Sequence, residues 1–264
     1  MPEGDTVWRA AAKLDRALTG HRLTISDFRV PGYATWDLTG GTVIRTLARG
    51  KHLLTRIDAD RAWTLHTHLK MEGSWHVYPE GEKWRRPAEQ VRVVLGIESR
   101  KAVGFSLGIV EIVPRHDEAA LVAHLGPDLL GPDWDEDLAL RNLRAEPARP
   151  VGQALLDQRN LAGVGNMYMA ELCFTSGIHP ATPLHLVGDL PRLVRRAKQM
   201  LEVNKERAIQ TTTGDLRPRE RMWVYRRDTS PCRRCETPIR VEMLGEPGRE
   251  RAAYWCPSCQ PAGF

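Results

Sequence analysis

The sequence predicts an α+β protein of several domains: an antiparallel β-sandwich with a flanking helix, then a helical domain, then a zinc-binding β-hairpin. Short β-type runs fill residues 22–113, helical periodicity takes over from residue 133, and two Cys-x2-Cys pairs stand near the end. At 264 residues, with 42% hydrophobic and 27% charged residues, the chain has room for two domains and a small appendage.

The first element is expected to be a helix that Asp5 or Thr6 caps and Gly20 ends, since apolar positions from Val7 to Leu18 recur at steps of three and four residues. The short runs that follow are punctuated by glycine and proline, which favours antiparallel strands without crossover helices. Strands are expected at residues 22–30, 42–47, 52–57, 62–67, 75–78, 91–97, 101–105 and 109–113. Together these elements predict a β domain over residues 1–115.

The second half of the chain reads as helical. A linker is predicted over residues 116–132 and a helical domain over residues 133–214, followed by a zinc-finger domain over residues 215–264. The helices are expected at residues 133–145, 151–156, 166–176 and 191–208. Residues 214–230 form a short polar, basic connector to the zinc unit.

Positive charge is concentrated in the last quarter of the chain. Residues 192–251 hold 16 Lys and Arg against 9 Asp and Glu, while the formal net charge of the whole chain is only +5. The distribution favours a polyanionic partner for this segment, and a solvated charged face is the alternative. We find no apolar run long enough to span a membrane and no secretory signal, and paired cysteines at metal spacing fit a reducing compartment, so we expect the protein in the cytoplasm at the nucleoid. Nothing in the sequence demands an oligomer, so we expect a monomer, and we expect no nucleotide cofactor.

The four paired cysteines are the strongest single motif. Twenty residues separate Cys235 from Cys256 in the pattern Cys-x2-Cys-x20-Cys-x2-Cys, which suits tetrahedral coordination of one structural Zn²⁺. The ligands are Cys232, Cys235, Cys256 and Cys259. Residues 239–244 and 252–255 are the expected hairpin strands, and Arg249 and Arg251 flank its tip, where they could reach a phosphate.

Two further motifs are weaker than the cysteine pattern: a glycine-containing turn before a helix and the amino terminus. The glycines of Gly163-Val164-Gly165 would let backbone approach a phosphate at the start of a helix that begins with Asn166, although an ordinary helix–turn–helix connection has the same pattern. Pro2 becomes the amino terminus if Met1 is removed. A free α-amine has a pKa of about 7.7–8.0, so part of it is unprotonated and nucleophilic at neutral pH, and Glu3 could transfer protons beside it.

These motifs, in this order, resemble the formamidopyrimidine-DNA glycosylase/endonuclease VIII family of base-excision repair enzymes over essentially the whole chain. Pro2-Glu3-Gly4 is similar to the catalytic terminus of the family, and Arg49–Leu54 resembles the strand that carries its essential lysine, here Lys51. The segment 68–73 is similar to the loop that inserts into the duplex, residues 153–168 resemble the helix–two-turn–helix element, and Arg251 matches the arginine of the zinc hairpin.

The resemblance implies a bifunctional glycosylase and lyase acting on damaged DNA. Pro2 would attack the sugar of an extruded nucleotide to form a Schiff base, with Glu3 assisting, and the strand would break by β,δ-elimination. Lys51, Asn166, Arg249 and Arg251 would hold phosphates, and Met71 would fill the gap left in the stack. Alternative roles are an exposed strand lysine for Lys51, a core position for Met71, and a partial metal site or hydrogen bonds for the pair His66 and His68.

Two departures indicate the endonuclease VIII-like branch, whose substrates are mainly oxidised pyrimidines. Residues 99–112 lack the Arg-x-Phe-Gly element of the purine-excising branch, and the connector before the zinc unit is too short for that branch's loop over the lesion. An enzyme for oxidised purines and a non-catalytic, zinc-dependent damage-binding protein remain alternatives, and a retained Met1 would silence the chemistry. The sequence leaves open the preferred lesion, the opposite base and the choice between duplex and single strand.

Overall fold

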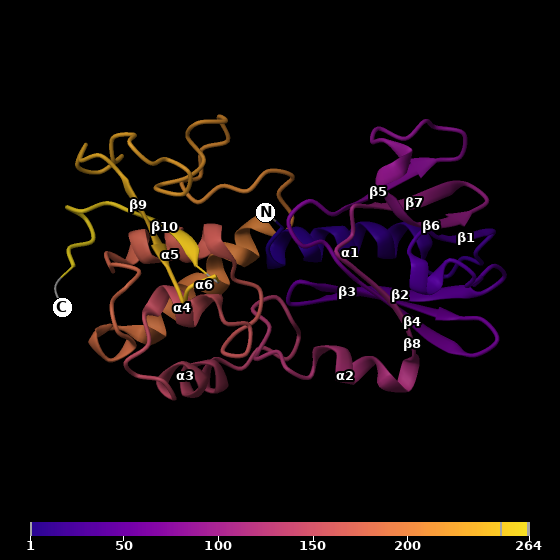
Figure 1. Cartoon of the computed structure of the whole chain (residues 1–264), viewed down its shortest axis with the longest axis horizontal. Coiled ribbons are helices and arrows are strands. Elements are labelled where there is room, and N and C mark those ends of the chain that lie inside the picture. The colour runs from indigo at the N-terminus through magenta and orange to yellow at the C-terminus, as the bar shows by residue number, and fades with distance from the viewer. Residues whose placement is uncertain (1, 249, 263–264) are drawn as a thin grey trace. The chain divides into compact units, whose positions relative to one another are not determined.

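The computed structural model describes residues 2–248 and 250–262. The chain divides into two compact units, residues 1–124 and 125–264, which are coloured from indigo to magenta and from magenta to yellow in Figure 1. The predicted linker at residues 116–132 and the predicted limit at residue 214 between the helical and zinc domains stay predictions. The predicted α+β class, with two sheets, helices and a carboxy-terminal cysteine cluster, is confirmed.

The first unit is built on two four-stranded antiparallel sheets. Their strand orders are β2-β3-β4-β8 and β1-β6-β7-β5. The first contains β2 (Thr42–Arg49), β3 (His52–Asp58), β4 (Ala62–His68) and β8 (Ile109–Pro114); the second contains β1 (Ile25–Phe28), β5 (Ser74–Pro79), β6 (Val91–Ile97) and β7 (Arg100–Phe105). Six of the seven residues of β6 are buried. Val93, Leu95 and Ile97 lie in the main apolar cluster of this unit, and Val91 and Val94 lie in a second, smaller cluster.

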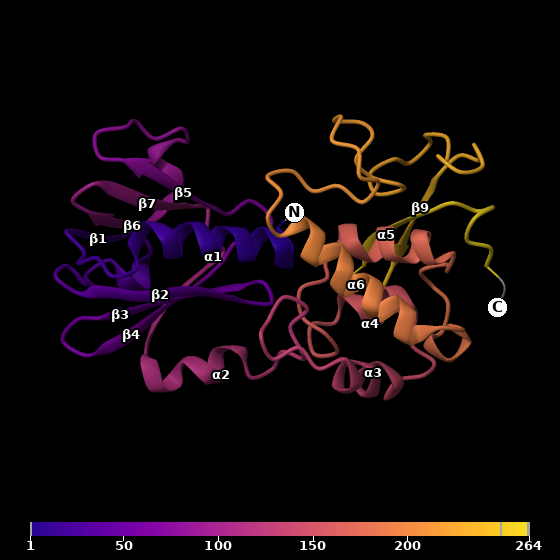
Figure 2. The ribbon, with the colours of Figure 1, turned by 180° about the vertical axis from the view of Figure 1, so that it is seen from behind.

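Helix α1 (Gly4–Leu18) lies between these two sheets and contacts strands of both, as the two views show (Figures 1 and 2). Val7, Leu14 and Leu18 pack with Leu53 and Val93 in one apolar cluster. The predicted cap at Asp5 or Thr6 is wrong. The carbonyl of Glu3 already accepts the amide of Val7 at 3.0 Å, so the first turn closes before either residue and Glu3 occupies the N-cap.

The second unit is centred on helix α5 (Asn166–Ser176). Its residues 166–174 are all buried, because α4 (Val151–Leu156), α6 (Leu190–Asn204) and strand β10 surround it. Helix α3 (Glu136–Arg144) packs on α6, which runs in front of α4 in Figure 2. The hairpin consists of β9 (Arg240–Leu244) paired with β10 (Arg251–Trp255).

Several predicted limits need correction. The first predicted strand is confined to β1, because only one isolated bridge, from Arg22 to Thr42, extends it. Helix α2 (Glu118–Val122) lies within residues 116–132, whose role as a linker stays a prediction. Helix α6 ends at Asn204 and not at residue 208, since the Asn204 side chain bonds both the amide and the carbonyl of Thr211 and turns the chain there. Short 3-10 helices are η1 (Pro31–Tyr33), η2 (Ala88–Gln90), η3 (Arg115–Asp117) and η4 (Leu184–Leu186). No helix in the described part of the chain is long and apolar enough to cross a membrane.

Candidate active site

The amino-terminal turn places a carboxylate directly beside Pro2. Glu3 is 0% exposed at the N-cap of α1, while Pro2 is half-buried. Asp5 is also 0% exposed, so the first turn of α1 holds two buried carboxylates near the positive end of the helix dipole. Sequence reasoning treated Asp5 as a cap and missed this pairing. Met1, on whose removal the predicted nucleophile depends, lies outside the described residues.

Lys51 lies in a turn and not within a strand. Arg49 pairs with His52, and the two residues between them, Gly50 and Lys51, form the tight connection of the β2–β3 hairpin. Gly50 has a φ of 56°, the left-handed conformation that such two-residue turns require. The turn holds the half-buried Lys51 at the end of the hairpin.

Four histidines gather next to this turn on β3, β4 and the end of the first unit. Nδ1 of His52 lies 2.8 Å from Nε2 of His66, whose Nδ1 lies 2.9 Å from the Glu111 carboxylate. His68 and His124 contact the His52 ring edge-on. The hydrogen-bonding role expected for His66 is thus confirmed. Within the described residues, the geometry that could hold a metal ion is found at the cysteines and not here.

Two histidines of this cluster, His52 and His68, are neutral near neutral pH. Burial lowers the pKa of His52 to about 3, with His68, His66, His124 and Lys70 adding to the effect. Burial likewise lowers the pKa of His68 to about 4, and the charges of Lys70 and Lys51 push it further down. The imidazoles of His52 and His68 therefore add no positive charge beside Lys51 and Lys70 at neutral pH.

Met71 is 61% exposed on the loop between β4 and β5. This exposure excludes the core position that was the alternative for Met71. An apolar side chain in such a position suits contact with another apolar or aromatic surface.

In the second unit, Asn166 and the start of β10 are brought together. Asn166 begins α5, as predicted, and its Nδ2 donates to the carbonyl oxygen of Ala252 at 2.8 Å. Ala252 directly follows the exposed Arg251. The Asn166 side chain is only 7% exposed, and its Oδ1 has no hydrogen-bond partner among the described residues. Asn166 therefore anchors the hairpin strand that carries Arg251. Arg249 lies outside the described residues.

The four cysteines of the zinc motif converge on one point. Their sulfur atoms lie within 4.8 Å of one another. Sγ of Cys235 is 3.4 Å from that of Cys256, and Sγ of Cys232 is 3.9 Å from that of Cys259. Four sulfurs about 2.3 Å from a central zinc are about 3.8 Å apart, whereas a disulfide needs about 2.0 Å. The spacing fits a metal with four thiolate ligands.

Thr237 favours the thiolate form of Cys235, whereas burial and the neighbouring sulfurs raise the pKa of Cys256 and Cys259. The hydroxyl of Thr237 lies 3.4 Å from its sulfur, and contacts with the Thr237 hydroxyl and amide lower the pKa of Cys235 to about 6. The fifth cysteine, Cys173, is fully buried in α5, and burial raises its pKa to about 12.

The basic connector before the zinc unit is an ordered structure. The Glu171 carboxylate, 0% exposed, accepts the amides of Trp223, Val224 and Tyr225 at 2.8 Å each, and also the Thr212 hydroxyl. Desolvation nevertheless raises the pKa of Glu171. Sequence reasoning missed Glu171, because its partners lie 41 to 54 residues away in the sequence.

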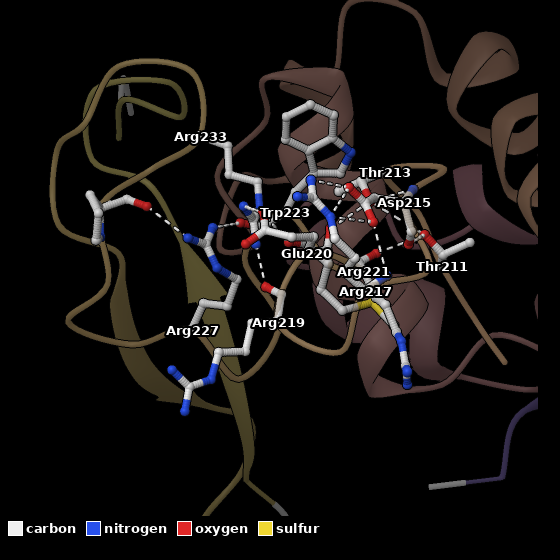
Figure 3. A network of polar contacts seen from close by, with 12 residues as sticks. Thr211, Thr213, Asp215, Arg217, Arg219, Glu220, Arg221, Trp223, Arg227 and Arg233 are labelled. Atoms are coloured by element: carbon white, nitrogen blue, oxygen red, sulfur yellow. Dashed lines mark hydrogen bonds and ion pairs between the residues drawn. The ribbon is translucent and has the colours of Figure 1, made fainter.

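Arginines of the connector, together with Arg233 of the zinc unit, bind the connector backbone, as Figure 3 shows. Arg233 pairs with Glu220 and donates to the carbonyls of Arg219 and Met222, Arg221 donates to Leu216, and Arg227 donates to Trp223. Part of the positive charge predicted to face a polyanion therefore stabilises the connector itself.

Comparison with known proteins identifies relatives along the full length of the chain. Residues 1–106 match the formamidopyrimidine-DNA glycosylase N-terminal domain, and residues 125–215 match the formamidopyrimidine-DNA glycosylase H2TH domain. The chain is 54% identical to "Probable endonuclease 8 2" of Streptomyces coelicolor over 98% of its own length and 94% of the relative. It is 49% identical to "DNA-(apurinic or apyrimidinic site) lyase Nei2" of Mycolicibacterium smegmatis, covering 99% and 100%.

The fold is similar to solved structures of more distant proteins. The Lactococcus lactis Fpg in complex with DNA containing an abasic site superposes with a TM-score of 0.79 at 21% identity, over 98% of this chain and 100% of that one. MutM in complex with DNA containing carbocyclic 8-oxo-G gives a TM-score of 0.80 at 21% identity, over 98% and 99%.

Proposed function

Because the chain belongs to the formamidopyrimidine-DNA glycosylase/endonuclease VIII family, we propose that it is a bifunctional DNA glycosylase and AP lyase of base-excision repair that removes oxidised pyrimidines. The names of the relatives at about half identity support the glycosylase and lyase activities. The observation that carries the mechanism is the buried carboxylate of Glu3 directly beside Pro2 at the first turn of α1.

The proposed reaction begins with extrusion of the damaged nucleotide, which costs less for a lesion than for a normal pair. With Met1 removed, the Pro2 nitrogen attacks C1′ of the deoxyribose, the bond from C1′ to the base breaks, and its electron pair leaves with the base. Glu3 transfers protons during ring opening. The product is an iminium between Pro2 and C1′, which carries positive charge without needing a proton because proline is a secondary amine.

The iminium then acts as an electron sink for strand cleavage. Loss of a proton from C2′ allows the C3′–O bond to break, with the phosphate as leaving group, and a second elimination breaks the C5′–O bond. Hydrolysis of the remaining iminium frees Pro2. Lys51 and Arg251 would bind the phosphates beside the extruded sugar, where they neutralise the departing charge.

The remaining predicted residues have binding roles in this proposal. Asn166 would hold a phosphate at the start of α5 while it anchors the carbonyl of Ala252. Arg249 would contact the backbone from the hairpin tip, and Met71 would enter the stack in place of the extruded base. The proposed partner is damaged DNA, and we propose that the protein works as a monomer in the cytoplasm at the nucleoid.

We assign the cysteine cluster to one structural Zn²⁺ held by Cys232, Cys235, Cys256 and Cys259. Four thiolates leave no open position, so this ion would fold the hairpin and take no part in the chemistry. The hairpin in turn presents Arg251.

The short connection between β7 and β8 supports a preference for oxidised pyrimidines. Only Ser106, Leu107 and Gly108 connect the two strands, which leaves no room for a purine-branch element opposite the lesion. A panel of duplexes with thymine glycol, 5-hydroxycytosine, 8-oxoguanine and formamidopyrimidine separates the choices. Faster excision of the purine lesions would move the assignment to the alternative branch.

The catalytic assignment is tested by trapping with borohydride. Wild-type protein without a tag at the amino terminus should form a covalent adduct with an abasic-site duplex, and a variant with one extra residue before Pro2 should form none. Glu3→Gln should slow base excision by about 100-fold or more, the usual contribution of a proton-transfer group. Tight binding of damaged DNA without any adduct would favour the non-catalytic damage-binding alternative.

A further inference from the structure

The loop that carries Met71 is rigidly built. It connects β4 to β5 through residues 69–73, and Lys70 within it has a φ of 50°, a left-handed conformation that a lysine rarely adopts. The Lys70 amide donates to Nδ1 of His68 at 2.9 Å, and the Gly73 amide donates to the carbonyl of Leu69 at 2.8 Å. These two bonds close both sides of the turn around Met71.

Two glycines show how tightly the loop is packed. A Cβ at Gly73 would lie 2.4 Å from the Leu69 carbonyl oxygen, and a Cβ at Gly108 would lie 2.2 Å from Cγ of Lys70. Neither position accepts a side chain without a backbone shift. The loop is therefore fitted to its surroundings even though Met71 itself is 61% exposed.

Arg86 fastens the carboxyl-terminal side of this loop from a distant part of the sequence. Its Nη1 donates to the carbonyl of Glu72 at 3.2 Å and to Oγ of Ser74 at 2.8 Å. Its Nε donates to the side chain of Gln90 at 3.0 Å, and its guanidinium lies 5.6 Å from the ring centre of the fully buried Phe105. The guanidinium thus spans from the sheet core to the residue next to Met71.

We infer that Arg86 is a positioning residue that holds the Met71 loop in the conformation needed to enter the DNA stack. This inference rests on the proposed function. A loop that is already ordered loses little conformational entropy when Met71 inserts. A loosened loop would have to become ordered while the lesion is extruded, and the entropy lost would raise the free-energy barrier to cleavage. Arg86 would then act through Met71 and without contact to the reacting atoms.

A double-mutant cycle tests this dependence. Arg86→Gln removes the paired donors, and the single-turnover cleavage of a duplex with an abasic site should slow by about 10- to 100-fold, the range expected from losing a charged hydrogen bond. When Met71→Ala is already present, adding Arg86→Gln should slow the single-turnover cleavage rate little further. Equal slowing in both backgrounds, or no effect of Met71→Ala alone, would overturn the inference.

A second readout reports insertion directly. With a duplex that contains a non-cleavable tetrahydrofuran site and 2-aminopurine opposite it, wild-type binding should raise the fluorescence, and Arg86→Gln should reduce this rise. Arg86→Lys, which keeps one cationic donor, should recover part of it even if Arg86→Gln folds poorly. The neighbouring Arg85→Ala is the matched control, because Arg85 is 75% exposed and contacts only the Glu82 side chain and Tyr78 in the described interactions.

The outcomes separate this inference from the proposed function. If wild-type protein cleaves and traps the abasic duplex but Arg86→Gln matches wild type in rate and fluorescence, the role of Arg86 is wrong and the function stands. If wild-type protein gives neither cleavage nor an adduct, the proposed function fails first.

Discussion

The candidate DNA-contacting residues of the first unit and those of the second unit are held in place in different ways. Lys51 and Met71 sit on turns at the edge of two sheets that close around an extended apolar cluster, which includes α1. Arg251 begins the second strand of a two-stranded hairpin, and the apolar cluster around Cys232 and Cys256 has only six buried residues. A two-stranded hairpin is marginal by itself. The difference predicts that the first unit is stabilised by burial, whereas the hairpin depends on the zinc proposed for its four cysteines.

Removal of zinc should have the largest effect, because it should unfold the hairpin and leave the first unit folded. Chelation, or Cys256→Ala, should unfold the hairpin and weaken DNA binding, because structural zinc contributes about 10–16 kcal/mol to folding at neutral pH. The β-sheet signal of the first unit in circular dichroism should remain. Cys173→Ala, which changes the buried thiol outside the cluster, should keep one zinc per chain. Unchanged DNA binding after complete chelation would contradict the role given to the hairpin.

Glu171→Ala should cause the next largest effect, a loss of folding stability in the second unit. It leaves three backbone amides and the Thr212 hydroxyl without their buried acceptor, so the free energy of unfolding should fall by about 3 kcal/mol or more. Urea unfolding followed by tryptophan fluorescence measures it, since Trp223 lies at the network. Ala in place of the exposed Glu206 is the control. A loss below 1 kcal/mol (about the value of one ordinary hydrogen bond) would mean that the connector is held by other contacts.

Gly73→Ala should act on the first unit alone. The added Cβ would overlap the Leu69 carbonyl, and relief of this clash should cost about 1–3 kcal/mol of stability and displace Met71. Gly32→Ala in the same unit has no heavy atom within 4 Å of the new Cβ and is the matched control. Thermal unfolding and single-turnover cleavage of both variants check the prediction, which fails if the two behave alike.

Acid should produce the smallest and most gradual effect. His52 and His68 bind protons less readily in the folded chain, where their pKa values are about 3 and 4, than in the unfolded chain, where they are about 6.5. The unfolded state therefore takes up protons first, and stability should be lost as the pH falls from about 6.5 towards 4. His52→Gln should flatten the dependence of Tm on pH, and the exposed His116→Gln should not. Parallel curves for wild type and His52→Gln would contradict the account.

The sequence predicted well those features that depend on local residue patterns. Cysteine spacing predicted the converging sulfurs, and period-two runs predicted the strands to within a few residues. The start of α1 was misjudged because a capping residue and a buried first-turn carboxylate look the same in a single sequence. Resemblance to the family supplied the roles of Lys51, Met71 and Arg251, which composition and spacing alone leave open.

What the sequence could not predict depends on contacts between distant residues. Arg86 stands in a run of exposed cations, and nothing local distinguishes it from Arg85, yet it reaches back 14 residues to Glu72. Glu171 lies in a buried helix and its acceptor role emerges only when the connector folds over it. The neutral state of His52 likewise follows from burial among other histidines.

The central claim is that the Pro2 nitrogen is the nucleophile, and mapping the trapped adduct tests it most directly. After borohydride reduction of the complex with an abasic-site oligonucleotide and trypsin digestion, fragmentation should locate the added sugar on Pro2 within the peptide of residues 2–9. Glu3 and Asp5 in the same peptide should be unmodified. An adduct on Lys51 or Lys70, or a wild-type terminus that still carries Met1 while the protein cleaves DNA, would contradict the account.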